Sequence, residues 1–318
     1  MRLVQDSLKL RTLWASERHC AFTDIIQHNG HWFCAFRDAT DHMSYDGVVR
    51  ILTSTDGVTW RASWVLNWQG ADLRDPKFLA GPQNQLMLNT GVRSAIRVVC
   101  GCNTTTASWV LDADNQAWST PILDASAHCT WRWMPTQVGD RFYVVGYSGK
   151  DRDGCLYASE DGINWQAWVK PFFPNLRIYS NEASLVCQGE KLICLLRRDK
   201  KGGYPAAVGS AYPPYSDWTW HELNQAIGGP KLINLSDDTL IAAYRVIDYE
   251  QMTAKIELAE LNLAEKKLVP LFDLPSEGDC SYAGMVEHQG QLFISYYSTP
   301  ENETAQIYLA RLDIAQDV

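Results

Sequence analysis

Two short segments of this chain are near copies of each other, 54–60 (STDGVTW) and 159–165 (SEDGINW). Each follows an apolar, β-prone run, so each is predicted to be a strand that ends in a tight turn. In such a turn the aspartate caps backbone N–H groups, the glycine supplies a positive φ and the tryptophan folds back onto the apolar layer. A strand-and-turn unit that recurs along a chain is typical of β-propellers and solenoids.

The repeat extends over the whole chain with a period of about 50 residues. The two copies lie about two periods apart, and further β-prone segments stand at 107–111, 207–210, 256–261 and 307–312. An apolar hairpin precedes each of these segments, and no long segment has the 3.6-residue period of a helix. The sequence therefore predicts an all-β, six-bladed β-propeller in which residues 1–318 form a single domain. A five-bladed propeller with one irregular unit is the alternative.

Composition and charge exclude several classes of partner. The net charge is −9 and lysine and arginine do not cluster, which argues against nucleic acid and an anionic membrane as partners. The first six residues contain no apolar segment and no stretch approaches a membrane span, so we expect a cytoplasmic protein.

Nine cysteines are scattered along the chain, and their apolar surroundings favour small core residues in a reducing compartment. Cys100 and Cys102 are too close together for an ordinary metal knuckle, and no histidine or cysteine pair at zinc spacing accompanies them. The sequence predicts neither a metal nor a cofactor.

Ionisable residues end several apolar strands, where they are costly unless they are paired or face a wet cavity. In a propeller the innermost strands converge on the central axis, so residues far apart in sequence can meet there. The residues singled out in this way include Arg18, Glu182, Arg245 and Tyr282.

This ordered series resembles the active site of the sialidase (neuraminidase) superfamily, and the two repeated turns resemble its Asp box. The resemblance covers essentially the whole chain and implies a β-propeller glycoside hydrolase. Three arginines would clamp the substrate carboxylate, since a guanidinium holds a carboxylate by two parallel hydrogen bonds. By their place in the series these are Arg18, either Arg197 or Arg198 (Arg198 being preferred), and Arg245. The nucleophile would be Tyr282, with Glu182 as its base.

The resemblance also implies a general acid a few residues after an arginine. Arg37 matches that arginine, and the segment after it offers Asp38, Asp41 and His42 as proton donors. His42 and Asp41 lie nearest the expected position. The chain departs from the family after Arg18, where the segment 19–22 (HCAF) replaces an Ile-Pro pair.

Two further enzyme hypotheses remain open. The segment 73–76 (LRDP) resembles the Arg-Asp-Pro of five-bladed furanosidases, in which the aspartate orients the sugar, so that Asp24, Asp75 and Glu182 would form a two-carboxylate site. A polysaccharide lyase acting on uronic acids would instead use His42, His128 and Tyr282 for acid–base chemistry.

Aromatic residues favour a sugar as the ligand. The chain has 13 tryptophans and 14 tyrosines, whose flat faces and polar edges suit sugar rings, and Trp131 and Trp133 are the best candidates for contact. A propeller that only binds carbohydrate is the non-enzymatic alternative. The function predicted is a sialidase-like hydrolase that acts on a small acidic sugar or oligosaccharide.

Overall fold

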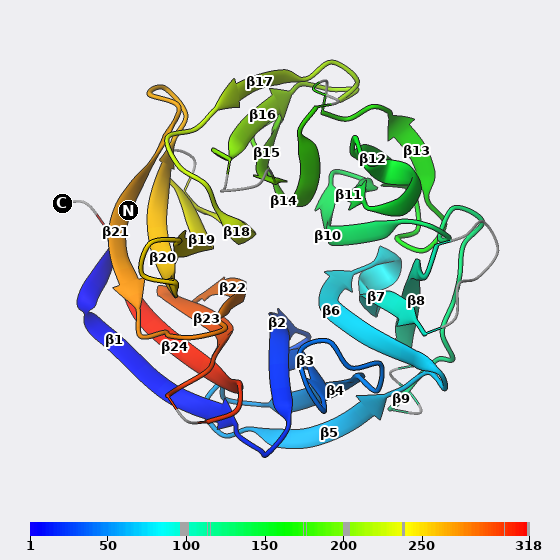
Figure 1. The fold of residues 1–318 in the computed structure, drawn as a ribbon, viewed down its shortest axis with the longest axis vertical. Helices are drawn as coiled ribbons and strands as arrows, with labels where there is room; N and C mark the ends of the chain where they lie inside the picture. The colour runs from blue at the N-terminus through cyan, green and yellow to red at the C-terminus, as the bar shows by residue number, and fades with distance from the viewer. Residues whose placement is uncertain are drawn as a thin grey trace.

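Six four-stranded antiparallel sheets form a ring around a central axis (Figure 1). The computed structural model describes residues 1–95, 102–112, 114, 116–173, 175, 177–199, 204–236, 239–301 and 303–316. This part contains two short 3₁₀ turns, η1 (Pro82–Asn84) and η2 (Gly149–Asp151), and none of its helices is long and apolar enough to cross a membrane. The predicted six-bladed propeller is confirmed, and the five-bladed alternative is wrong.

Each blade runs from an innermost strand at the axis to an outer strand at the rim. Blade 1 consists of β2 (His19–His28), β3 (His31–Ala39), β4 (Val48–Ser54) and β5 (Arg61–Leu66). Blade 2 consists of β6 (Ala71–Ala80), β7 (Leu86–Ser94), β8 (Thr104–Asp112) and the short β9 (Ala117–Trp118). Blade 3 consists of β10 (Trp131–Val138), β11 (Arg141–Tyr147), β12 (Cys155–Ser159) and β13 (Gln166–Val169).

The second half of the ring follows the same order. Blade 4 consists of β14 (Tyr179–Gln188), β15 (Lys191–Asp199), β16 (Ala207–Ala211) and β17 (Thr219–Glu222). Blade 5 consists of β18 (Gly228–Ser236), β19 (Thr239–Asp248), β20 (Thr253–Asn262) and β21 (Lys267–Leu274). Blade 6 consists of β22 (Ser281–His288), β23 (Gln291–Ser298), β24 (Gln306–Ala315) and, as its outer strand, β1 (Arg2–Trp14) from the start of the chain.

Apolar side chains hold neighbouring blades together. Six buried clusters lie one between each pair of adjacent blades. Between blades 2 and 3, for example, Leu79 and Met87 pack with Phe142, Val144 and Trp165. Because strand residues alternate between the two faces of a sheet, each blade presents apolar residues to both neighbours.

The two repeated turns share one hydrogen-bond pattern. The Oδ1 atom of Asp56 accepts the backbone N–H groups of Val58 and Thr59 at 2.8 and 2.6 Å. The Oδ1 atom of Asp161 accepts those of Ile163 and Asn164 at 2.8 and 2.7 Å. Each turn therefore closes the hairpin between the third and fourth strands of its blade.

A β-bulge interrupts the innermost strand of every blade near its beginning. A bulge inserts an extra residue, bends the strand and redirects a side chain. In five blades the first residue of the bulge has a positive φ: Phe22 (62°), Asp75 (49°), Met134 (50°), Gly229 (53°) and Tyr282 (53°). The bulge of blade 4 contains Asn181 and Glu182. Asp75, Glu182 and Tyr282 thus all stand in the bulges of innermost strands, in blades 2, 4 and 6.

One disulfide corrects the expectation that the cysteines are isolated core residues. Cys102, just before β8, is bonded to Cys129, just before β10, with 5.6 Å between their Cα atoms. The two segments run together because the backbone N–H of Cys129 donates to the carbonyl of Thr104. Cys100 lies outside the described residues. The six remaining cysteines are free thiols: Cys20, Cys34, Cys155, Cys187, Cys194 and Cys280.

Candidate active site

A tyrosine on the innermost strand of blade 6 and a glutamate on that of blade 4 meet at the axis. The hydroxyl of Tyr282 donates to Oε1 of Glu182 at 2.8 Å. Both residues stand in bulges, which turn their side chains out of the regular pleat. Glu182 is 4% exposed, and Tyr282 is half-buried.

Two further groups fix the Glu182 carboxylate. Its Oε2 accepts from Nη1 of Arg197 at 2.7 Å and from the backbone N–H of Gly229 at 2.9 Å. Burial raises the pKa of Glu182, but the charge of Arg197 and these hydrogen bonds outweigh it, so the pKa lies below its usual value. Glu182 is therefore an ionised acceptor that faces a phenol.

Tyr282 keeps its proton in the resting site. Burial and the negative charge of Glu182 raise the pKa of Tyr282 well above its usual value of 10. Its ring is packed on three sides, edge-on against Phe22 at 5.1 Å, tilted against Trp133 at 5.1 Å and stacked on Tyr297 at 6.2 Å. The hydroxyl therefore has one orientation, toward Glu182.

Asp75 is a second buried carboxyl at this level of the ring. It is 8% exposed, and among the described residues its Oδ1 atom has no hydrogen-bond partner. Burial raises its pKa to about 6 in spite of the nearby Arg74 and Lys77, and the charge of Glu182 adds to the rise. Two carboxyls whose pKa values are pushed in opposite directions are typical of acid–base sites.

Arg245 is a positively charged group near Tyr282 whose guanidinium is only partly paired. Within the described part of the chain its Nε has no hydrogen-bond partner, and its Nη1 lies 3.9 Å from Oδ1 of Asp279. A Cβ on Gly228 would lie 3.1 Å from Nε of Arg245, so this glycine gives the side chain room. A cavity of about 40 Å³ borders Arg245 and Gly228 together with Arg197 and Arg198.

Two histidines bond to the carboxylate of Asp279 at the solvent-accessible edge of the site, which is called its mouth below. Oδ2 of Asp279 lies 2.6 Å from Nδ1 of His42 and 3.1 Å from Nε2 of His19. Oδ1 accepts from the hydroxyl of Tyr297 at 2.8 Å. The ring of His42 stands 5.4 Å from that of Phe22, which also contacts Tyr282.

The structure separates the two arginines that the sequence left open. Arg197 contacts Glu182, whereas Arg198 points to the opposite face of β15 and pairs with Glu222 at 2.7 Å. Neighbouring residues of a strand face opposite sides, so only one of the two reaches the axis. The structure therefore places Arg197 against Glu182, whereas the preferred Arg198 is held by Glu222.

Arg18 does not reach the cluster either, which corrects its placement as the first arginine of the clamp. Its Nε pairs with Asp38 at 2.5 Å and its Nη2 with Asp46 at 3.2 Å. The next residue, His19, takes the inward position and binds Asp279. A further guanidinium, that of Arg74, borders the site instead, 4.6 Å above the ring of Phe22.

Of the three predicted proton donors, only His42 borders the cluster. The Asp38 carboxylate is held by Arg18 and Arg50, and Oδ1 of Asp41 caps the N–H of Met43 at 2.6 Å. Arg37 is fully buried. It pairs with Asp72 at 2.6 Å and donates to the carbonyl of Asp41 at 2.9 Å, so it fixes the loop that carries His42.

His128 lies apart from these groups. It is exposed and forms a β-bridge with Thr105, so no contact joins it to His42 or Tyr282 among the described residues. Asp24 accepts the N–H of Phe78 at 2.8 Å. Trp131 and Trp133 are buried beside Tyr147 and Met134, and the ring of Trp133 contacts that of Tyr282.

Sequence reasoning missed His19, Arg74, Asp279 and Tyr297. Asp279 and Tyr282 stand three residues apart in the segment 278–284, and that short polar run before a strand was the only available signal. The other three lie in strands, His19 at the start of β2, Arg74 beside the bulge of β6 and Tyr297 near the end of β23.

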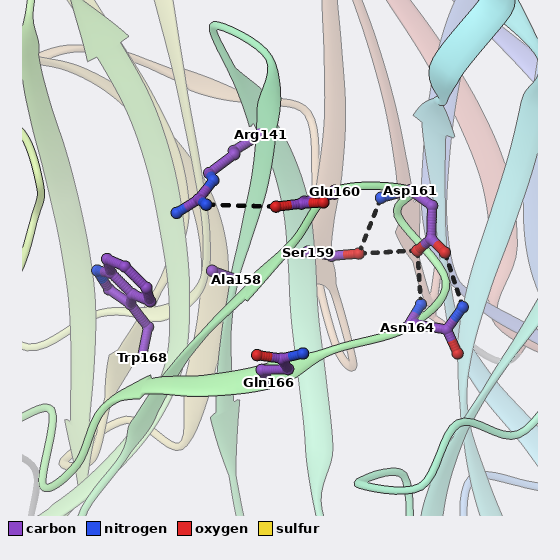
Figure 2. A pocket seen from close by; sticks show the side chains of 8 residues that line it. All are labelled: Arg141, Ala158, Ser159, Glu160, Asp161, Asn164, Gln166 and Trp168. Carbon is purple, nitrogen blue, oxygen red and sulfur yellow. Dashed lines mark hydrogen bonds and ion pairs between the residues drawn. The ribbon is translucent and has the colours of Figure 1, made fainter.

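A larger cavity lies away from the axis. It has a volume of about 240 Å³ and surrounds the second repeated turn, on β12 and β13 (Figure 2). Ser159, Asp161 and Asn164 bond to one another there, and Arg141 pairs with Glu160 at 3.3 Å. These side chains are engaged in closing the turn, so the cluster at the axis is the better candidate site.

The fold defined by these blades is that of the sialidases and of an arabinanase. A Dyadobacter fermentans protein of unknown function has a TM-score of 0.82 at 16% identity, over 97% of this chain and 100% of that chain. The Penicillium chrysogenum α-L-arabinanase, complexed with arabinobiose, has a TM-score of 0.69 at 13% identity, over 96% and 98%. Trypanosoma rangeli sialidase has a TM-score of 0.66 at 10% identity, over 97% of this chain and 60% of that chain. No protein-family model and no curated protein matches the sequence.

Proposed function

We propose that this protein is a glycoside hydrolase that releases a terminal sugar bearing a carboxylate, such as sialic acid or a related acidic sugar. The observation that carries the proposal is the 2.8 Å hydrogen bond from the Tyr282 hydroxyl to the ionised Glu182. A phenol is a weak nucleophile at neutral pH unless a base takes its proton. Glu182 is placed to do so.

The reaction follows from these contacts. The Tyr282 oxygen attacks the anomeric carbon while Glu182 accepts the phenolic proton, and the bond to the leaving oxygen breaks. His42 gives a proton to that oxygen. Water then attacks the tyrosyl-linked carbon, its proton passes to His42, and Tyr282 recovers its own from Glu182, so the configuration at the anomeric carbon is retained. A neutral nucleophile also avoids repulsion from the substrate carboxylate.

Substrate binding is assigned to two side chains with an unpaired polar atom, Arg245 and Asp75, and to groups beside them. Arg245 with its open Nε, assisted by Arg197, binds the carboxylate. Asp75 binds a sugar hydroxyl or amide through its unpaired Oδ1. Trp133 supplies an apolar face beside Tyr282.

The alternatives receive less support from the geometry. A lyase with His42, His128 and Tyr282 would need His128 at the axis, but its side chain is exposed. A propeller that only binds sugar would not need a phenol bonded to a buried, ionised carboxylate. Such a pair is costly to bury, and sugar binding alone does not require it.

The test is NMR of the purified protein with a fluorogenic α-sialoside, with unsaturated products from uronic-acid oligosaccharides followed in parallel. We expect free sugar with retained configuration, and Tyr282→Phe should lower kcat by about 10³-fold or more. Tyr296→Phe is the matched control, since the Tyr296 hydroxyl bonds to Pro275 outside the cluster. Release that survives in Tyr282→Phe, or unsaturated product without release, contradicts the proposal.

A further inference from the structure

Asp279 connects the mouth of the site to three aromatic side chains. It precedes β22 by two residues and stands three residues before Tyr282. Its Oδ2 meets His42 at 2.6 Å and His19 at 3.1 Å, and its Oδ1 meets Tyr297 at 2.8 Å. Both carboxylate oxygens are therefore engaged by donors from blades 1 and 6.

These contacts decide which nitrogen of His42 faces the substrate. Because Nδ1 bonds to Asp279, Nε2 is the nitrogen left for the site. The side chain of His42 is 42% exposed, so Nε2 is accessible from the mouth. Nη1 of Arg74 donates to the His42 carbonyl at 2.9 Å and fixes the backbone behind the ring.

Asp279 is ionised in this environment. Burial raises its pKa, but the hydrogen bonds from His19, His42 and Tyr297 lower it far below its usual value. The other charged group that faces it is Arg245, 3.9 Å from Oδ1. An ionised carboxylate is a hydrogen-bond acceptor, so it accepts the Nδ1–H of His42 and holds the ring in one orientation.

A cation shared by His19, His42 and Asp279 is the competing explanation, because their three ligand atoms lie within 4.8 Å of one another. The separations of 2.6 and 3.1 Å are hydrogen-bond lengths. Arg245 already supplies a positive charge next to the same carboxylate. The geometry therefore favours a proton between these groups over a metal.

We propose that Asp279 is the positioning residue of the site, which holds His42 by Nδ1 and presents its Nε2–H to the leaving oxygen. The inference rests on the proposed hydrolase function. When the glycosidic C–O bond breaks, Nε2 loses its proton to the leaving oxygen and His42 becomes a neutral imidazole with Nδ1–H still on Asp279. The attacking water later returns a proton to Nε2, so the cycle balances.

The test combines a structural and a kinetic measurement on Asp279→Asn. Imidazole ¹⁵N spectra of the wild-type protein should show the Nδ1–H form of His42 in its neutral state, and Asp279→Asn should populate both tautomers. In the kinetics, Asp279→Asn should lower kcat by about 10²-fold. The effect on KM should be smaller. Asp273→Asn, which removes the same charge on the outer strand β21, should leave both measurements unchanged.

The outcomes separate this inference from the proposed function. The ¹⁵N spectra test the Asp279–His42 contact even if no substrate is hydrolysed, so an inactive wild-type protein overturns the hydrolase and not the contact. An unchanged tautomer or an unchanged kcat in Asp279→Asn overturns the positioning role. A stoichiometric metal in the purified protein, lost in His19→Ala, overturns it as well.

Discussion

Asp75 combines two features that cost folding free energy, a positive φ and a buried carboxyl. Its φ of 49° is unusual for a residue with a side chain, and its carboxyl is buried with an unpaired oxygen. Such features persist where the surrounding structure imposes them, and they gather at functional sites. The neighbouring Asp72 is buried on the same strand but pairs with Arg37 at 2.6 Å. The charge of Asp72 is therefore compensated, whereas the charge of Asp75 lowers the stability of the fold.

The raised pKa of Asp75 predicts a pH-dependent stability. Between pH 4 and its folded-state value of about 6, the folded protein binds more protons at this group than the unfolded chain, so stability falls as pH rises. Above pH 6 the penalty is complete, on the order of 2–3 kcal/mol. Asp75→Asn, isosteric and tolerant of a positive φ, should therefore raise the free energy of unfolding at pH 7, with the gain shrinking toward pH 4.

Urea unfolding at several pH values measures this effect. Asp72→Asn is the control with the opposite expectation, because it leaves Arg37 buried without its partner and should destabilise by about 3–5 kcal/mol. The same Asp75→Asn protein should lose activity, since stability gained at a strained site is commonly paid in function. A less stable Asp75→Asn protein at pH 7 would show that the carboxyl is not buried in its charged form.

At the scale of the element, the bulges in the innermost strands determine which side chains face the axis, and the repeat alone does not predict this. The alternation of strands predicted the hairpins, but a bulge shifts the alternation by one residue, and its position is not visible in the sequence. The bulge of β2 lies between Ala21 and Asp24, and His19, before it, takes the inward position instead of Arg18. Arg197 and Arg198 are neighbours on β15, and the alternation of a strand alone does not tell which of the two faces Glu182.

The bulge of β18 offers a direct test, because Gly229 both donates its N–H to Glu182 and lies against blade 6. A Cβ at Gly229 would overlap Oγ of Ser281 and lie 3.0 Å from the ring of Tyr282, at a φ of 53°. Gly229→Ala should thus displace Tyr282 and lower kcat on the order of 10²-fold. Gly139→Ala, with a similar φ of 58° and open space around it, should lose only about 1 kcal/mol of stability and no activity. Equal kinetics in the two variants would contradict the role of this bulge.

At the scale of the whole molecule, the period of the sequence was sufficient to predict six blades and their convergence on one axis. The resemblance further placed Tyr282 and Glu182 together, and the structure brings them to hydrogen-bond distance. Asp279 and Tyr297 could not be predicted, since their positions depend on how blades 6 and 1 pack against each other. The pairing of Cys102 with Cys129 depends likewise on two loops that meet only in the folded ring.

Closure of the ring depends on β1, which pairs with β24 from Arg2 to Trp14 and completes blade 6 (Figure 1). Leu3 and Leu8 of this strand pack on the cluster between blades 5 and 6. Deleting residues 1–14 should expose the edge of β24, lower Tm by roughly 10 °C or more and promote association of the truncated chains. A peptide of residues 1–15 added in trans should bind that edge and raise Tm again, whereas a scrambled peptide should not. If the truncated protein unfolds at the wild-type Tm without the peptide, the ring is held by contacts between blades alone, and strand β1 contributes nothing to its closure.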